Sequence, residues 1–298
     1  MELRHLRYFI AVAEHLNFSR AAEALLTAQP SLSHQIRELE AELKVTLFER
    51  THRYVTLTAE GNLLLPEARA IVERVDTLAT LQDASSAPRG PLRIASITAS
   101  TIGILPKVLP SYRDSFPNVE LSVETLVPED GVRALVERRV DVAFVRRPLD
   151  DPRLDSVIVA EEQLCAALPS SHPLARRRKV PLRLLNGLDF VGLRDEITGD
   201  FNSVVNELCN EHGVVPHSTV RTGNVETMLG LIASGMGVAV ASAVLKIMLL
   251  EGVELRPLEP RKVLKNLCLA WRRDRAALPT IRSFRDHVAA EAITFYAE

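Results

Sequence analysis

The first 58 residues carry three short runs of apolar positions that recur at steps of three and four, which is the period of an α-helix. The first run extends from Leu3 to Ala13. The second is RAAEALL, which begins at Arg20 and follows the candidate N-cap residues Asn17 and Ser19. The third run consists of Leu32, Ile36, Leu39 and Leu43. This pattern predicts three packed helices joined by tight turns.

Pro30 stands two residues before the third run, and we expect it to be the first residue of that helix. Proline there loses only a donor that has no partner within the helix, and its fixed φ suits the helix. The polar side opposite the apolar stripe is formed by Pro30, Ser33, His34 and Arg37. Two helices joined by a short turn, the second with a polar N-terminal face, predict a helix-turn-helix whose second helix enters the DNA major groove.

Residues 47–58, LFERTHRYVTLT, are rich in β-branched and aromatic residues, which predicts a hairpin, or wing, beside the third helix. The cations in it are Arg50, His52 and Arg53, placed to meet DNA phosphates. One long helical pattern follows from residue 59, with an apolar seam at heptad spacing formed by Leu64, Ala68, Ile71, Val75 and Leu78. The seam predicts a dimerisation helix. The alternative is a helix that packs onto the chain's own first domain.

From Pro91 the sequence alternates strand-like and helix-like segments, and the stretch SSAPRGP that leads into it is typical of a linker. The order strand, helix, strand, helix, strand from Leu92 to Val145 predicts a parallel sheet. A second set of elements begins near Gln163. We expect the strand at residues 268–271 and a last helix over residues 281–295 to return to the first set.

These patterns divide the chain into three parts: a winged helix-turn-helix over 1–58, a dimerisation helix and hinge over 59–90, and an α/β domain over 91–298. Two subdomains are expected within the last part, one over 91–161 plus 268–298 and the other over 162–267.

Charge and composition narrow the classes of function. The net charge of the 298 residues is -2, and residues 1–58 contain seven Lys or Arg against seven Asp or Glu. DNA affinity grows with the number of phosphates neutralised, so a single copy should bind weakly and dimerisation should supply further contacts. The apolar runs are too short for a membrane span and the N-terminus does not resemble a secretory signal, so we expect a cytoplasmic protein without membrane contact.

The chemistry of an enzyme is missing from the sequence. There is no nucleophile elbow, no phosphate-binding loop with a Walker pattern and no H-E-x-x-H zinc motif, so neither catalytic nor metal residues are assigned and no cofactor is expected. Cys165, Cys209 and Cys268 are isolated in apolar patterns, which favours core packing.

Several of these segments resemble one family. FSRAAEALLTAQPSLSHQIRELEAEL followed by LFER and VTLTAEG closely resembles the signature of LysR-type transcriptional regulators, and MELRHLRYF resembles the branch that controls aromatic-compound catabolism. The resemblance implies a winged helix-turn-helix, a dimerising helix and an effector domain like periplasmic binding proteins. It also implies a homodimer or homotetramer on double-stranded promoter DNA, with RNA polymerase as a possible further partner. The chain departs from the family pattern at Ala28, Lys44 and Ser242.

The resemblance assigns DNA-binding residues by position: Gln29, Pro30, Ser31, Ser33, His34 and Arg37 on the major-groove face, and Arg50 and Arg53 on the wing. It also implies a small anionic effector, aromatic or carboxylate, between the two subdomains.

The candidate effector site combines two strand ends, where ligands bind in open parallel sheets. The segment TASTIG is a loop that follows the first strand and opens a helix, and it contains Thr98, Ala99, Ser100 and Thr101. Arg146 follows the third strand. Phe201, Asn224 and Thr227 complete the candidate set. Helix capping by the hydroxyls and an ion pair at Arg146 remain the alternative interpretations.

Two other functions stay open at this point. One is an oxidant-sensing regulator of the same family that uses one of its cysteines, and the other is a cytoplasmic solute-binding protein with an accessory N-terminal module.

Overall fold

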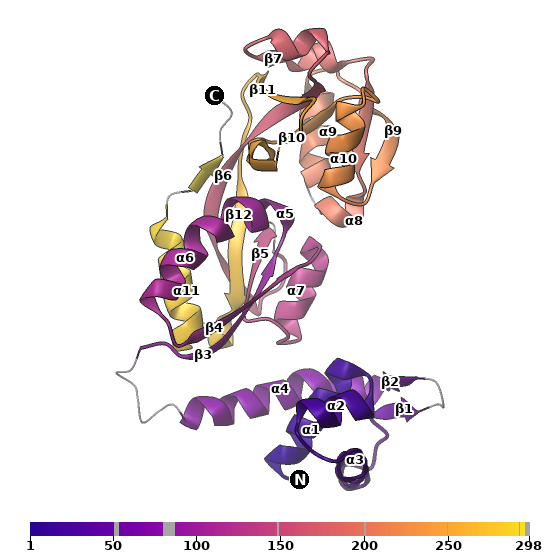
Figure 1. The fold of residues 1–298 in the computed structure, drawn as a ribbon, viewed down its shortest axis with the longest axis vertical. Coiled ribbons are helices and arrows are strands. Elements are labelled where there is room, and N and C mark those ends of the chain that lie inside the picture. The colour runs from indigo at the N-terminus through magenta and orange to yellow at the C-terminus, as the bar shows by residue number, and fades with distance from the viewer. Residues whose placement is uncertain are drawn as a thin grey trace. The chain divides into compact units, whose positions relative to one another are not determined.

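The computed structural model describes residues 1–50, 54–79, 87–147, 149–199, 201–248, 250–291 and 293–295. Contacts divide the chain into two compact units, unit 1 from Met1 to Ser86 and unit 2 from Ala87 to Glu298 (Figure 1). Each unit has a hydrophobic core of its own.

Unit 1 is a small helical domain with a two-stranded hairpin. Its elements are α1 (Leu3–His15), α2 (Phe18–Ala24), α3 (Gln29–Leu43), β1 (Phe48–Arg50), β2 (Val55–Leu57) and α4 (Ala59–Ala79). The strands β1 and β2 pair antiparallel and form the predicted wing. Phe48 of the wing packs against Phe9 and Phe18, with ring centroids 5.5 and 5.8 Å away, so the wing shares the core of the helices.

Local sequence explains where these helices begin and end. The Asn17 side chain accepts hydrogen bonds from the N–H groups of Ser19 and Arg20 and caps α2. The first residue of α3 is Gln29, so Pro30 occupies the second helical position and not the first; a proline is tolerated anywhere in the first turn because those N–H groups have no helical acceptor. Lys44 ends α3 in the left-handed conformation, with φ of 58°.

The apolar seam predicted on α4 is divided between two environments. Ala68 is fully buried against the core of unit 1, with Leu64 packed beside it. Ile71 and Val75 are 40% and 39% exposed, whereas the side chain of Leu78 lies outside the described part of the helix. One part of α4 therefore packs on its own chain, and another part presents apolar side chains to solvent.

The elements of unit 2 alternate strands and helices. Its first half contains β3 (Gly90–Ser96), α5 (Thr98–Gly103), α6 (Leu105–Ser115), β4 (Val119–Thr125), α7 (Pro128–Val136) and β5 (Val142–Arg146). The second half contains η2 (Pro173–Arg176), β7 (Val180–Pro181), η3 (Leu182–Leu185), β8 (Asp189–Leu193), α8 (Asp195–Thr198), α9 (Phe201–Glu211), β9 (His217–Thr222), α10 (Val225–Ala233), β10 (Ala239–Ser242), η4 (Ala243–Met248) and β11 (Val253–Glu259).

Two long strands, β6 (Leu154–Pro169) and β12 (Val263–Arg272), run through both halves and connect them (Figure 1). Strands β4, β3 and β5 are parallel, as the sequence predicts, and β12 joins them antiparallel to β5. Strand β6 pairs with β12 along one stretch and with β10 and β11 along another. The main sheet therefore continues from one half to the other without a break.

Two predictions for unit 2 are wrong. The sequence places TASTIG in a loop that opens a helix, but all six residues already form the short helix α5, in which the N–H of Thr101 donates to the carbonyl of Ile97 at 2.9 Å. The last helix does not reach Phe295; instead η5 (Arg273–Arg275) and α11 (Pro279–Ala290) follow β12, and Ile293–Phe295 form β13, parallel to β6.

A buried carboxylate holds the first half of unit 2 together. Asp141 accepts hydrogen bonds from the backbone N–H and side chain of Arg93 on β3, and from Arg275 Nη2 at 2.7 Å. Burial by itself would raise the pKa of Asp141, but the hydrogen bonds and charges of the two arginines together lower it below the ordinary value.

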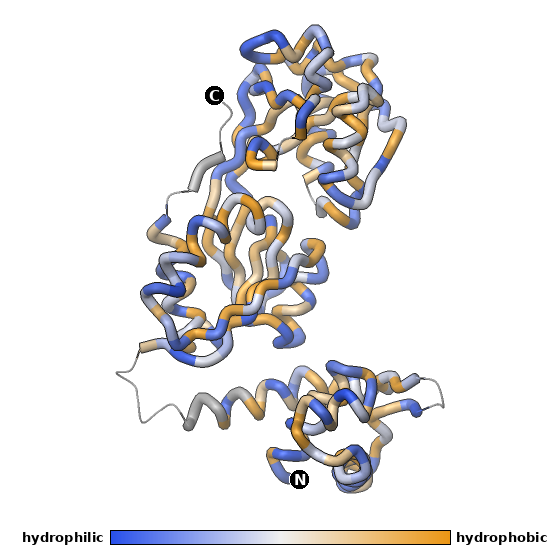
Figure 2. The backbone as a smooth tube through the Cα atoms, viewed as in Figure 1, coloured by the Kyte–Doolittle hydropathy of each residue, from blue (hydrophilic) through white to orange (hydrophobic). Residues whose placement is uncertain are grey.

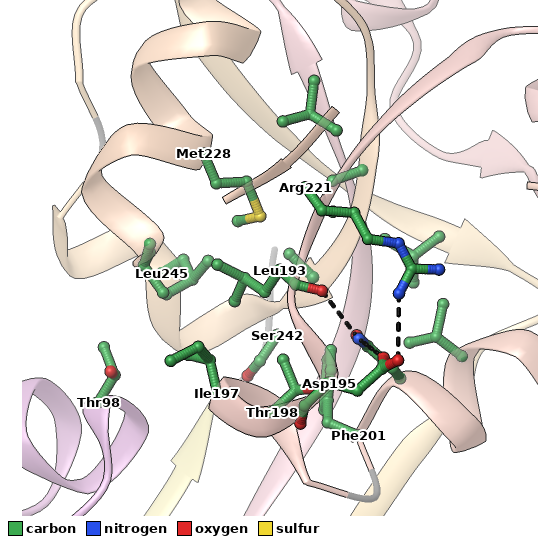
Figure 3. A pocket seen from close by; sticks show the side chains of 18 of the residues that line it. Thr98, Leu193, Asp195, Ile197, Thr198, Phe201, Arg221, Met228, Ser242 and Leu245 are labelled. Atoms are coloured by element: carbon green, nitrogen blue, oxygen red, sulfur yellow. Dashed lines mark hydrogen bonds and ion pairs between the residues drawn. The ribbon is translucent and has the colours of Figure 1, made fainter. Parts of the chain in front are cut away.

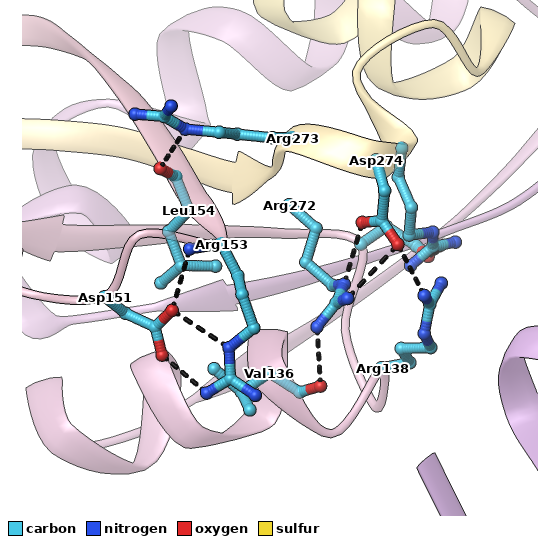
Figure 4. Close-up of polar contacts among 10 residues, drawn as sticks. Val136, Arg138, Asp151, Arg153, Leu154, Arg272, Arg273 and Asp274 are labelled. Carbon is cyan, nitrogen blue, oxygen red and sulfur yellow. Dashed lines mark hydrogen bonds and ion pairs between the residues drawn. The ribbon is translucent and has the colours of Figure 1, made fainter. Parts of the chain in front are cut away.

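A second polar cluster lies at the same end of β12 (Figure 4). Asp274 accepts from Arg138 at 2.5 Å and from Arg272 at 3.0 Å, while Arg272 Nη1 donates to the carbonyl oxygen of Val136 at 3.0 Å. Arg273 donates to the carbonyl of Leu154 at 2.9 Å. These bonds tie the end of α7 to the strands β6 and β12.

Leu26 should be a source of strain in the turn between α2 and α3. Its φ is 51°, and its side chain is 96% exposed, so packing does not compensate for the unfavourable backbone conformation. We expect Leu26→Asn to stabilise unit 1 by roughly 0.5–1 kcal/mol, because Asn tolerates this conformation. Slower hydrogen exchange of the α2 and α3 amides would show the gain. Leu63→Asn, at an exposed position within α4, is the control and should give no gain.

The Asp141 cluster should make unit 2 sensitive to acid. Because the folded-state pKa lies below the unfolded value of 3.8, its contribution to stability is present above that pH and is lost as the pH falls through the folded-state pKa. Asp141→Asn should cost about 3–5 kcal/mol at neutral pH because it removes the carboxylate partner of the buried Arg275. Trp271, the single tryptophan, reports the unfolding of unit 2 by fluorescence. Asp114→Asn, which removes an exposed partner of Arg113, should change stability by less than about 1 kcal/mol.

Candidate DNA-contacting face and effector pocket

The third helix has the two faces that its sequence predicts. Leu32, Ile36 and Leu39 are fully buried in the core of unit 1. The residues on the other side are exposed or, for Ser33, half-buried: Gln29, Pro30, Ser31, Ser33, His34 and Arg37. The predicted groove-reading residues thus share one surface of α3.

The start of α3 lacks a side-chain cap. Ala28 is the N-cap residue, and its methyl side chain cannot accept a hydrogen bond from the first turn. The N–H groups of this turn have no helical acceptor either, so they remain available as donors beside the exposed face. Within the face, Arg37 Nε donates to the carbonyl of Ser33 at 3.3 Å, and His34 lies 3.6 Å from the Glu38 carboxylate.

Arg50 has a structural role on the wing. Its guanidinium donates to Glu40 at 2.9 Å and lies over the ring of Phe18, 4.7 Å from the centroid. The Glu40 carboxylate also accepts from the backbone N–H groups of Leu47 and Phe48 at 2.9 and 3.2 Å, so one side chain fixes the wing to α3. Arg50 is therefore partly engaged within unit 1. The other predicted wing cations, His52 and Arg53, lie outside the described residues.

Unit 2 contains a pocket where its two halves meet (Figure 3). Its empty volume, counted together with the part open to solvent, is about 1060 Å³. Most of the wall is apolar, and Figure 3 shows Leu193, Ile197, Met228 and Leu245 around the space. The first half contributes residues of α5, α7 and β5 to the walls, and the second half contributes residues of β8, α8, α9, β9, α10, β10 and η4.

A buried ion pair lies at one end of this pocket. Arg146 donates from both Nη atoms to the Glu162 carboxylate, with Nη2 to Oε1 at 3.2 Å, and from Nη1 to Asn266 Oδ1 at 3.2 Å. The Glu162 side chain has no exposed surface and also accepts from Ser242 Oγ at 2.8 Å. The guanidinium carbon of Arg146 lies 5.1 Å from the centroid of the Phe201 ring. The charge of Arg146 is therefore balanced, and its position is fixed by several neighbours.

A second polar group lies on another wall of the pocket (Figure 3). Asp195 of α8 accepts from Arg221 Nη1 at 3.1 Å and from Asn202 Nδ2 at 2.7 Å. The hydrogen bond from Asn202, with the charge of Arg221, lowers the pKa of Asp195. Arg221 and Asp195 are both well exposed, so this pair stays accessible to a ligand.

The structure brings four of the eight predicted effector residues to the pocket: Thr98, Ala99, Arg146 and Phe201. Ser100 and Thr101 are used within α5, where their hydroxyls donate to the carbonyl of Ile97 at 2.9 and 3.1 Å. Asn224 caps α10 by accepting from the N–H of Thr227 at 2.8 Å, and neither residue lines the pocket. Capping, the alternative interpretation for these hydroxyls, applies to Ser100, which also accepts from the backbone N–H of Ile97 at 3.2 Å.

Several lining residues were not anticipated from the sequence. Asp195, Asn202, Arg221 and Met228 are the main examples, and Glu162 lies behind Arg146. The available signal was weak: Arg221 is near the end of a strand-like segment, HSTVRT, and such ends line sites in parallel sheets.

The three cysteines are buried. Their relative exposure is 0%, and burial raises the pKa of each thiol, for Cys165 to about 12. A thiol in this state has little thiolate to react with an oxidant.

Within the described part of the chain, no group of three or more His, Cys, Asp or Glu side chains is arranged to hold a metal ion. None of the helices described is both long enough and apolar enough to cross a bilayer.

Two family models match this chain. Residues 3–62 match the bacterial regulatory helix-turn-helix protein of the lysR family, and residues 85–292 match the LysR substrate binding domain. The first covers the helix-turn-helix and wing, and the second covers the unit that holds the pocket.

Whole proteins are similar as well. The Hca operon transcriptional activator HcaR of Escherichia coli K12 is 32% identical over 284 residues, covering 95% of this chain and 96% of HcaR. Full-length CbnR in complex with its target DNA is 25% identical and has a TM-score of 0.71, covering 97% of this chain and 99% of CbnR. A full-length OxyR variant of Pseudomonas aeruginosa has a TM-score of 0.79 at 25% identity, covering 97% of this chain and 94% of OxyR. The chain belongs to the LysR family of DNA-binding transcriptional regulators.

Proposed function

We propose that this regulator reads promoter DNA with the exposed face of α3 and is controlled by a small carboxylate effector that binds in the pocket of unit 2. The observation that carries the proposal is the pairing of a bare, polar α3 face in one unit with an apolar pocket around a fixed arginine in the other. In this proposal the major-groove contacts come from the face Gln29 to Arg37. Arg50 and Arg53 contribute phosphate contacts from the wing.

Dimerisation through α4 supplies the second α3. Leu63, Ile71 and Val75 are apolar and exposed on this helix, the first to 75%. Burying such side chains against a second copy is favourable, at about 25 cal/mol per Å² of apolar surface. Because residues 1–58 have no net charge, two copies in register also double a weak set of phosphate contacts. A homotetramer would bring two such dimers together. We further propose that the regulator is cytoplasmic and acts on RNA polymerase at the promoter.

The effector class follows from the hydrogen bonds of Arg146. A guanidinium has five N–H groups, and the contacts to Glu162 and Asn266 use three of them. Nε and the second N–H of Nη2 form the remaining edge, which matches the two oxygens of one carboxylate. The surrounding apolar side chains suit a ring or a hydrocarbon body, so a small aromatic or aliphatic carboxylic acid fits the pocket.

The buried cysteines argue against the oxidant-sensing alternative for this chain. A solute-binding protein alone would leave the exposed α3 face without a role.

Arg37 provides the test of the DNA-contacting face. We expect Arg37→Ala to weaken binding to the protein's own promoter by roughly 10- to 100-fold, since removing one base or phosphate contact costs about 1–3 kcal/mol. Titration of labelled promoter DNA measures the change, and ligand-induced thermal shifts of unit 2 should stay intact. Full retention of sequence-specific binding by Arg37→Ala would contradict the assignment of this face.

Arg146 provides the test of the effector pocket. Carboxylic acids with a small ring should raise the melting temperature, whereas their neutral amides should do so far less. Arg146→Met leaves Glu162 buried without its partner and is expected to destabilise the domain. The double variant Arg146→Met/Glu162→Gln removes both charges and keeps the fold testable. In it, the preference for the acid over the amide should fall by about tenfold or more, since hydrogen bonds to charged groups contribute about 1.5–3 kcal/mol each.

The matched control is Arg221→Met, which removes a lining arginine from another wall. An unchanged preference for the acid in Arg146→Met/Glu162→Gln, together with its disappearance in Arg221→Met, would place the carboxylate at Arg221 instead.

A further inference from the structure

The strongest concentration of positive charge in the chain lies in unit 2, away from the helix-turn-helix. Residues 170–188 contain five Arg or Lys and no Asp or Glu, in a chain whose net charge is -2. We name these cations the basic patch: Arg176, Arg177, Arg178, Lys179 and Arg183. All five are exposed, and the loop that carries four of them is strongly hydrophilic in Figure 2.

The basic patch is held on a fixed support. Ala175 and Val180, on either side of the four consecutive cations, are buried in the core of the second half. Arg256 Nε donates to the carbonyl of Ala175 at 2.8 Å, and Val180 lies opposite Leu258 in the pairing of β7 with β11. The segment between these anchors is therefore a short, rigid projection with exposed side chains.

The cations of the patch are not neutralised by neighbours. Across the residues that the structure describes, none of the five forms an ion pair with a carboxylate. The acids beside the patch are Glu254, which is paired with Arg256, and Glu259, which lies opposite Pro181 in the strand pairing. Four consecutive cations held without counter-charges raise the local potential and suit a polyanion.

The sequence of unit 1 carries less positive charge than negative charge. Residues 1–86 contain nine Lys or Arg and twelve Asp or Glu, so the unit that reads DNA has a net negative charge. Phosphate contacts supply much of the affinity of a DNA-binding protein. We propose that the basic patch of unit 2 is a second DNA-binding surface, which contacts the phosphate backbone of promoter DNA outside the sequence read by α3.

The arginines of the basic patch favour DNA phosphate as the partner, because the planar guanidinium presents paired N–H donors that match two oxygens of a phosphate. Phosphate contacts carry no sequence information, so the patch would add affinity and fix the path of the flanking DNA without changing which bases are recognised.

The test compares two promoter fragments with the full-length protein. The short fragment contains only the sequence protected by the helix-turn-helix units, and the long fragment extends it by about three helical turns, or roughly 30 base pairs, on each side. The variant is R176Q/R177Q/R178Q/K179Q. On the long fragment, the slope of log affinity against log salt concentration should be shallower for this variant than for the unchanged protein. The difference should be about 0.9 for each phosphate that the patch no longer neutralises, and so up to roughly 3.6 for four cations. On the short fragment the affinity and its salt dependence should be those of the unchanged protein.

Single substitutions provide a matched control. R177Q removes one cation of the patch, and R282Q removes one exposed cation of α11 that has no ion pair among the described residues. Only R177Q should weaken binding to the long fragment. Trp271 fluorescence during unfolding checks that each variant is folded.

Two outcomes would overturn the proposal. Equal salt dependence of the fourfold variant and the unchanged protein on the long fragment would show that the patch does not contact DNA. Reduced transcription with unchanged DNA binding would assign the patch to an acidic protein surface instead. Arg37→Ala should weaken binding to the short and the long fragment alike. That result tests only the face of α3 and leaves the test of the basic patch unaffected.

Discussion

The carboxylate of Glu162 is the constraint around which unit 2 is arranged. It lies on β6, the strand that runs through both halves, and its side chain is fully buried. A carboxylate in that position is costly unless it is paired and hydrogen-bonded. Arg146 at the end of β5 and Ser242 at the end of β10 satisfy it, and Asn266 of β12 holds the arginine in turn. Four strands thus meet at one charge pair.

Such a pair does more for geometry than for stability. Replacing a buried ion pair with apolar side chains often leaves stability unchanged, whereas removing one partner is strongly destabilising. Here the pair sets the direction of the arginine at the end of the pocket and leaves one edge of its guanidinium facing away from Glu162 and Asn266. The remaining edge of the guanidinium is therefore held in one orientation within a mostly apolar pocket, an arrangement in which a few polar groups fix how a ligand lies.

The elements of unit 1 could be predicted from sequence because their signals are local. The stripe Leu32, Ile36 and Leu39 fixes which side of α3 is buried, and the alternation after Leu47 fixes the wing. The sequence misplaces Pro30 by one residue because proline is tolerated at either of the first two helical positions. The engagement of Arg50 with Glu40 was not predictable, since it depends on how the wing folds back onto α3.

The pocket was predictable only at its strand ends. Arg146 and the α5 segment belong there because parallel strands share one carboxyl edge. The partner of each polar side chain could not be predicted from the sequence: Ser100 and Asn224 look like ligand contacts but form hydrogen bonds with the backbone of their own helices. Asp195 and Arg221 come from distant segments. Glu162 meets Arg146 only because β12 pairs with both β5 and β6 and brings the two strands into one sheet.

The length of β6 has a mechanical consequence. Its sixteen residues span about 50 Å at roughly 3.3 Å per residue, and with β12 they form the connection between the halves. A change of about 5° in the bend of β6 near its middle would displace a point about 25 Å along the strand by about 2 Å, since a strand rises roughly 3.3 Å per residue. The ion pair of Arg146 and Glu162 lies close to that middle. A small change at this guanidinium would therefore produce a larger displacement at the far ends of the two halves.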